Sequence, residues 1–139
     1  MNHGTVKRVI GPVVDVHFPE GKLPEIYNAV EIRLPARKVV LEVVQQLGNR
    51  DVRTIALSST DGISRGLEAV DTGASITVPV GEQTLGRMFN VVGDPIDGKG
   101  PVEGAERLPI HRKPPRFTEI LPATEMLETG IKVVDLLTP

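Results

Sequence analysis

Turn-forming residues punctuate the first part of this chain, and between them apolar and polar side chains alternate along the sequence. Val14, Val16 and Phe18 share one side of such an alternation, and Asp15 and His17 share the other. A period of two places successive side chains on opposite faces of a β-strand, whereas helical side chains recur every 3.6 residues or so. This pattern restricts roughly the first eighty residues to short strands joined by turns.

The alternating segments predict six strands, separated by glycine and proline residues that supply the backbone angles of tight turns. A closed barrel suits short antiparallel strands because closure leaves no exposed edge strand. The fold class predicted for residues 1–80 is therefore mainly β, a small six-stranded antiparallel β-barrel. Its expected strands are residues 5–10, 14–18, 30–34, 38–47, 52–57 and 75–80.

After residue 80 the apolar side chains recur at helical spacing. We expect a helix that ends at Gly93 as its C-terminal cap. Its apolar stripe consists of Leu85, Met88, Phe89 and Val92. Residues 98–117 are rich in proline and are predicted to form an extended connector, not a helix or a central strand.

A last short helix is expected to begin near Thr129, a good N-cap, and to stop before Pro139. It would bury Ile131, Val134 and Leu137. Residues 81–139 carry too few apolar side chains to form a domain by themselves. They are interpreted as the incomplete start of an α/β domain.

Composition argues against several classes of function. A net charge of −2 gives no reason to expect binding to nucleic acid or to an anionic membrane. The chain contains no cysteine, which excludes disulfides and thiolate chemistry. No apolar run approaches the roughly eighteen residues of a membrane span, and the strand pattern begins too close to Met1 for a signal peptide. We expect a soluble protein that stays in the compartment where it is made.

Gly93–Gly100 matches the pattern G-x-x-x-x-G-K of a phosphate-binding loop. That loop requires Ser or Thr after the lysine to hold magnesium, and Gly100 stands there instead. Two carboxylates, Asp94 and Asp97, would face the phosphates, and Pro101 follows where a helix should begin. The segment is interpreted as a solvated turn.

The acidic pairs and the histidines also give weak signals. Asp94 with Asp97 and Glu125 with Glu128 lie in turns or helix starts, where acidic residues are ordinary. The histidines are far apart and lack the spacing of metal ligands; they are His3, His17 and His111. His17 is expected to point outward from its strand.

A basic cluster in the proline-rich connector has two readings, an anion site or a solvated, subunit-facing stretch. The second reading is favoured because acidic residues lie nearby. Its members are Arg107, His111, Arg112, Lys113 and Arg116. No catalytic, cofactor-binding or metal-ligating residue is therefore predicted anywhere in the chain.

Several segments, in order along the whole chain, resemble the catalytic beta subunits of F-type (rotary) ATP synthases. Within the wider family, which includes alpha, vacuolar-type and export ATPases, two of these segments are more similar to beta than to its relatives: Pro24–Ala29 and Gly130–Asp135. The segments that carry the resemblance are Gly4–Val16, Leu23–Ala29, Val52–Leu57, Gly86–Asp97 and Glu128–Pro139.

The resemblance implies that the barrel belongs to a crown of six, three from beta and three from alpha subunits. Residues 81–139 would be the start of the nucleotide-binding domain, and the whole subunit would bind Mg-ATP and ADP and surround a gamma subunit. In the assembled complex it would make ATP from ADP and phosphate with a transmembrane proton or sodium gradient. The complex would lie at the cytoplasmic face of a bacterial plasma membrane, without direct membrane insertion.

The phosphate-loop Lys and Thr, the catalytic Glu and the adenine-stacking aromatics of that family match no position in this sequence. Phosphoryl transfer depends on such groups. The chain is therefore expected to be an N-terminal fragment that ends before the phosphate-binding loop, and to be inactive and free of cofactor by itself.

Two alternatives remain open. The chain could be a stand-alone small-barrel module that binds oligonucleotides, which would require basic grooves and stacking aromatics. Its aromatic residues are three Phe and one Tyr, a poor supply for that purpose. It could also be a non-catalytic assembly factor that adds its barrel to the ring of a partner.

Overall fold

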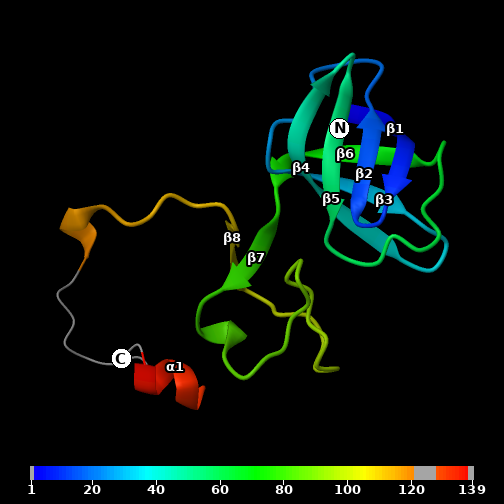
Figure 1. Cartoon of the computed structure of the whole chain (residues 1–139). Helices are drawn as coiled ribbons and strands as arrows, with labels where there is room; N and C mark the ends of the chain where they lie inside the picture. Colours follow the sequence, from blue (N-terminus) through cyan, green and yellow to red (C-terminus); the bar gives the residue numbers. More distant parts are fainter. Residues whose placement is uncertain (1, 121–127, 138–139) are drawn as a thin grey trace.

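A closed barrel of six antiparallel strands forms the N-terminal half of the protein (Figure 1). The computed structural model describes residues 2–120 and 128–137. The strand order is β1-β2-β5-β4-β3-β6, and β1 pairs with both β2 and β6, which closes the sheet. The strands are β1 (Asn2–Ile10), β2 (Val13–His17), β3 (Asn28–Arg33), β4 (Lys38–Gly48), β5 (Asp51–Ala56) and β6 (Glu68–Ser75). The predicted six-stranded barrel is confirmed.

The barrel interior is filled by aliphatic side chains and one phenylalanine. Val14, Val16 and Phe18 point inward and are fully buried, as the period-two alternation predicts. Each such side chain contributes roughly 1.5–3 kcal/mol when it leaves water. Filled in this way, the interior is a packed core and not a ligand cavity. The other core residues are Val6, Val30, Ile32, Val39, Leu41, Val43, Val52 and Ala69.

The pairing of β1 with β2 brings the backbone of β1 against the ring of Phe18, which is part of the core. A Cβ atom added to Gly4 would lie 2.8 Å from the ring of Phe18 and 2.8 Å from the carbonyl oxygen of His17. Real Cβ atoms do not approach other atoms so closely, because the repulsion is too steep. Glycine is therefore required at this crossing for steric reasons, although its backbone angles are ordinary for a strand.

The prediction of the sixth strand was wrong in its position. Residues 75–80 were expected to complete the barrel, but β6 ends at Ser75 and β7 (Thr77–Val80) pairs with β8 (Glu106–Pro109) in a separate two-stranded sheet. Gly73, a residue type typical of turns, lies within β6 at φ 73°, and the strand continues through it. The proposed domain division at residue 80 stays a prediction.

The helix predicted over residues 85–92 is absent. A single 3-10 turn, η1 (Glu82–Thr84), is followed by turns, and Gly86 adopts a left-handed conformation at φ 68°. The side-chain oxygen of Asn90 accepts hydrogen bonds from the backbone N–H groups of Val92 and Asp94, at 3.0 and 2.8 Å. Such local bonds compete with helical hydrogen bonds, which explains why the helix predicted from the apolar spacing alone does not form.

The last described segments are exposed. The 3-10 turn η2 (Phe117–Glu119) and the helix α1 (Lys132–Leu137) contain no buried residue, and α1 lies far from the barrel in Figure 1. The predicted final helix is confirmed, but the expected burial of its apolar residues is not seen: Ile131 and Leu137 are 57% and 71% exposed.

Glu125, one of the paired acids, lies outside the described residues. No helix in the described part of the chain has the length and apolar character to cross a membrane.

Replacement of Gly4 by alanine should lower the free energy of unfolding by about 1–3 kcal/mol, because the added methyl group would displace Phe18 or β2. Urea denaturation followed by circular dichroism measures the change. In the double variant Gly4→Ala/Phe18→Leu the loss should be smaller than the sum of the two single losses, since leucine removes the clashing ring atoms. Equal stability of Gly4→Ala and the wild-type chain would contradict this packing.

Candidate interaction surface

Three charged side chains lie in one row across the outer face of β1, β2 and β5. Asp15 is the register partner of Arg8 on one side and of Arg53 on the other. Arg8 donates from Nε and Nη2 to Asp15 Oδ2 at 3.0 and 2.6 Å. Arg53 donates from Nε to Oδ1 at 2.9 Å and from Nη2 to Oδ2 at 3.2 Å. One carboxylate therefore ties three adjacent strands together through two guanidinium groups.

The two arginines keep the buried carboxylate charged. The side chain of Asp15 is 5% exposed, and burial by itself would raise its pKa. Hydrogen bonds from Arg53, and then from Arg8, outweigh the burial and hold the pKa of Asp15 below its usual value. The row thus carries a net positive charge at neutral pH.

A β-bulge turns two consecutive basic side chains to the outside of β1. The register with β2 shifts between Val6 and Arg8, so that one extra residue, Lys7, is inserted. Val6 is buried, whereas Lys7 and Arg8 are both exposed. Without the bulge, alternation would turn Arg8 toward the core.

A second ion-pair group lies beside the row. Lys7 Nζ is 2.5 Å from Asp51 Oδ2, and His17 Nδ1 is 2.7 Å from Asp51 Oδ1. The hydrogen bond from Lys7, and then that from His17, lowers the pKa of Asp51. His17 is partly exposed on the outer face, as the sequence predicts.

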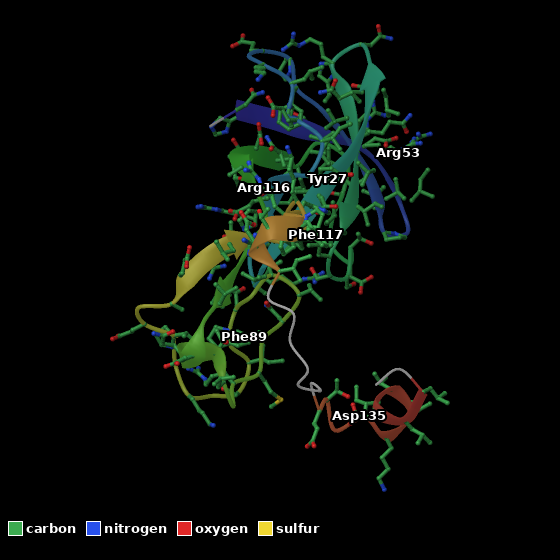
Figure 2. The ribbon with its side chains drawn as sticks, turned by 90° about the vertical axis from the view of Figure 1, so that its left-hand side faces the viewer. Tyr27, Arg53, Phe89, Arg116, Phe117 and Asp135 are labelled. Atoms are coloured by element: carbon green, nitrogen blue, oxygen red, sulfur yellow. The ribbon has the colours of Figure 1, made fainter. Side chains whose placement is uncertain are left out.

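Basic side chains other than Arg53 border two adjoining hollows in the outer surface. One, of about 510 Å³, is lined by Lys7, Arg8, Asp15, Leu47, Asp51 and Arg65, and a smaller one of about 330 Å³ again includes Lys7 and Arg65. Arg53 projects from the outer side of the barrel in Figure 2, away from the part of the chain that contains Phe89. We call Lys7, Arg8, Arg53 and Arg65 the basic wall.

The apparent phosphate loop is a set of turns held by its own acids. Arg87 donates from Nε and Nη2 to the carboxylate of Asp97 at 2.6 and 3.1 Å, which holds the pKa of Asp97 far below its usual range. The backbone N–H groups of Met88 and Lys99 also donate to this carboxylate, and Asp94 accepts from the side chain of Asn90. These carboxylates already accept the hydrogen bonds that a phosphate would need from the amide groups.

The basic cluster of the connector does not converge on one point. Arg107 on β8 donates to the backbone oxygen of Thr77 at 2.7 Å. His111 stacks on Tyr27 with ring centroids 4.0 Å apart, and its Nε2 lies 2.8 Å from Glu42 Oε2. The contacts of His111 anchor the connector to the barrel, whereas that of Arg107 ties β8 to β7. The other members are exposed: Arg112, Lys113 and Arg116.

In the described residues, 2–120 and 128–137, few side-chain groups indicate chemistry other than ion pairing. They contain no group of three or more acidic or histidine side chains that could hold a metal ion. His3, His17 and His111 each pair with a different carboxylate. The prediction that the chain holds no catalytic, cofactor-binding or metal residue stays a prediction.

Sequence reasoning missed the basic wall altogether. The available signal was Asp15 within the apolar run Val13–Val16, since an acid among buried positions demands a cationic partner. The sequence could not say which of its sixteen Lys and Arg residues supplies that partner.

The barrel is similar to a known family of domains. Residues 6–73 match the family model described as "ATP synthase alpha/beta family, beta-barrel domain". The match runs from β1 into β6 and thus covers the strands of the closed barrel.

Replacement of Asp15 by asparagine should destabilise the chain by about 1–3 kcal/mol at pH 7, because two guanidinium groups lose the negative charge and one of the two oxygens that accept their hydrogen bonds. The folded chain binds the Asp15 proton less tightly than the unfolded chain, whose Asp pKa is about 3.9. The stabilisation is therefore present above that pH and is lost as the pH falls below it.

Urea denaturation at pH 7 and pH 3 measures both effects, and the gap between Asp15→Asn and the wild-type chain should narrow at pH 3. Glu68→Gln is the matched control, because the pair of Glu68 with His3 is exposed and should contribute little. Equal losses for the two variants would contradict the role of the buried carboxylate.

Proposed function

We propose, from the match of the barrel to the ATP synthase alpha/beta family, that the chain is the N-terminal part of a catalytic beta subunit of F-type. In this role the barrel joins alternating alpha subunits in a hexameric ring around a gamma subunit. The complete complex makes ATP from ADP and phosphate with a transmembrane proton or sodium gradient, as a peripheral complex at the cytoplasmic face of a bacterial plasma membrane. The family match over residues 6–73 carries the proposal.

The packed interior of the barrel supports a role in assembly. Its core side chains are fully buried and fill the space in which barrels of other proteins hold a ligand. Function must then reside on the outer surface or in the following residues. A closed sheet, tied externally by the Arg8–Asp15–Arg53 row, is a rigid body suited to hold neighbouring subunits in place.

The part of the chain after the barrel is proposed to contribute the first elements of the nucleotide-binding domain. Phosphate contacts, magnesium coordination and the general base would come from other parts of the subunit and its neighbours. The turn at Gly93–Gly100 is closed by the pair of Arg87 with Asp97 and offers no cradle for a phosphate. The chain as given supplies structure, and Mg-ATP belongs to the complete subunit.

A stand-alone oligonucleotide-binding barrel is the second candidate, favoured by the basic wall alone. Such barrels stack bases on exposed aromatic side chains. Here Phe18 is buried in the core and Tyr27 is stacked on His111. Phe89 lies below the barrel in Figure 2, and Phe117 belongs to η2, which lies away from the barrel in Figure 1. None of the four aromatic residues borders the hollows of the basic wall, so the assembly role is preferred.

The chain should form a complex with the alpha subunit encoded in the same genome, and it should not bind Mg-ATP. Sedimentation velocity of the mixed proteins measures the first property and isothermal titration calorimetry the second. A fluorescent single-stranded oligonucleotide, titrated by anisotropy, is the control for the second candidate.

Failure to form a complex would argue against the assembly role. Binding of ATP at 1:1 stoichiometry in the micromolar range would contradict the prediction that the chain by itself does not bind nucleotide. Tight, salt-sensitive binding of the oligonucleotide would favour the alternative.

A further inference from the structure

The basic wall concentrates positive charge on a chain whose net charge is −2. It contains four cationic side chains and only two carboxylates, Asp15 and Asp51, which leaves an excess of two positive charges. Both carboxylates are buried beneath the cations, at 5% and 12% side-chain exposure. The cations therefore form the outermost layer.

The arginines of the row are held in place and keep donors to spare. A guanidinium carries five N–H groups. Arg8 and Arg53 each use Nε and Nη2 toward Asp15, so Nη1 of each makes no hydrogen bond to the described residues. Cations fixed in this way lose less conformational entropy when a partner binds.

Arg65 lies on the rim of both hollows without a partner of its own. The backbone of its loop is fixed to β1, since Gly66 N–H donates to Val6 O at 2.8 Å and Val6 N–H donates to Leu67 O at 2.9 Å. Its side chain is exposed and makes no hydrogen bond or ion pair with the described residues. An unpaired cation above a hollow that also contains Lys7 is ready to receive an anion.

We infer that these hollows bind a glutamate- or aspartate-bearing segment of a neighbouring polypeptide, with Arg65 and Lys7 as the contacts to its carboxylate. Leu47, 39% exposed, lies in the larger hollow and offers apolar contact to the same segment. A carboxylate on a polypeptide fits better than a free phosphate, because only the polypeptide also supplies apolar groups for contact with Leu47. A nucleic acid would also meet those two acids and would find no aromatic platform there.

Titration of the ¹⁵N-labelled chain with an acetylated, amidated peptide of six glutamates tests the site without any alpha subunit. Amide signals of Lys7, Arg8, Arg65 and Gly66 should shift, and about 0.5 M sodium chloride should weaken the binding because the contact is screened. Arg65→Glu should bind the peptide about tenfold more weakly. Arg65→Ala should show a smaller loss in the same direction.

Arg112→Glu is the matched control, because Arg112 is an exposed arginine with no partner in the described part of the chain and lies in the connector, away from the hollows. It should bind the peptide as the wild-type chain does, and a hexaglutamine peptide should shift none of the four signals. Equal weakening in Arg112→Glu and Arg65→Glu would reduce the effect to net charge and overturn the site.

Two further outcomes would also overturn it. Inorganic phosphate or an oligothymidine that shifts the same signals more tightly than the glutamate peptide would assign the hollows to another ligand. Shifts that appear on dilution without peptide would assign them to a second copy of this chain. The peptide titration contains no alpha subunit. If the peptide does not bind, the proposed assembly role is therefore unaffected. If the chain does not bind the alpha subunit, the proposed peptide site is unaffected.

Discussion

Closure of the sheet is the constraint on which the rest of the structure depends. Because β1 pairs with β2 on one side and β6 on the other, every barrel residue lies either inside or outside the barrel. The inside is small enough to be filled by aliphatic side chains and Phe18, with Gly4 leaving room for the ring. The same closure gives each of the six strands a neighbour on both sides and leaves no edge strand in the barrel open to unwanted pairing.

With the interior filled, the outer face is where this barrel can act. The Arg8–Asp15–Arg53 row places a buried charge on that face, which is costly unless the charge is fully paired. Four hydrogen bonds from two guanidinium groups meet that requirement. The row links three strands and also orients two cations toward solvent, so one arrangement serves both stability and recognition.

The sequence pattern predicts some elements of this fold and misplaces others. Alternation predicted the buried residues of β2 because strand geometry is local and periodic. It placed the sixth strand too late, because Gly73 resembles a turn signal yet lies within β6. The apolar stripe of Leu85 and Met88 suggested a helix, but Gly86 and the side chain of Asn90 impose turns there. Those residues leave Leu85 and Met88 77% and 62% exposed.

The sequence by itself determined the barrel, the absence of thiol chemistry and the weakness of the apparent phosphate loop, since these follow from local periodicity and residue types. The tertiary structure alone decided which charges meet. Arg8 and Arg53 are 45 positions apart in the numbering and converge on Asp15 through strand register. The bulge at Lys7 then turns a neighbouring pair of basic residues outward. Register and bulges arise from pairing between distant segments, and no local pattern records them.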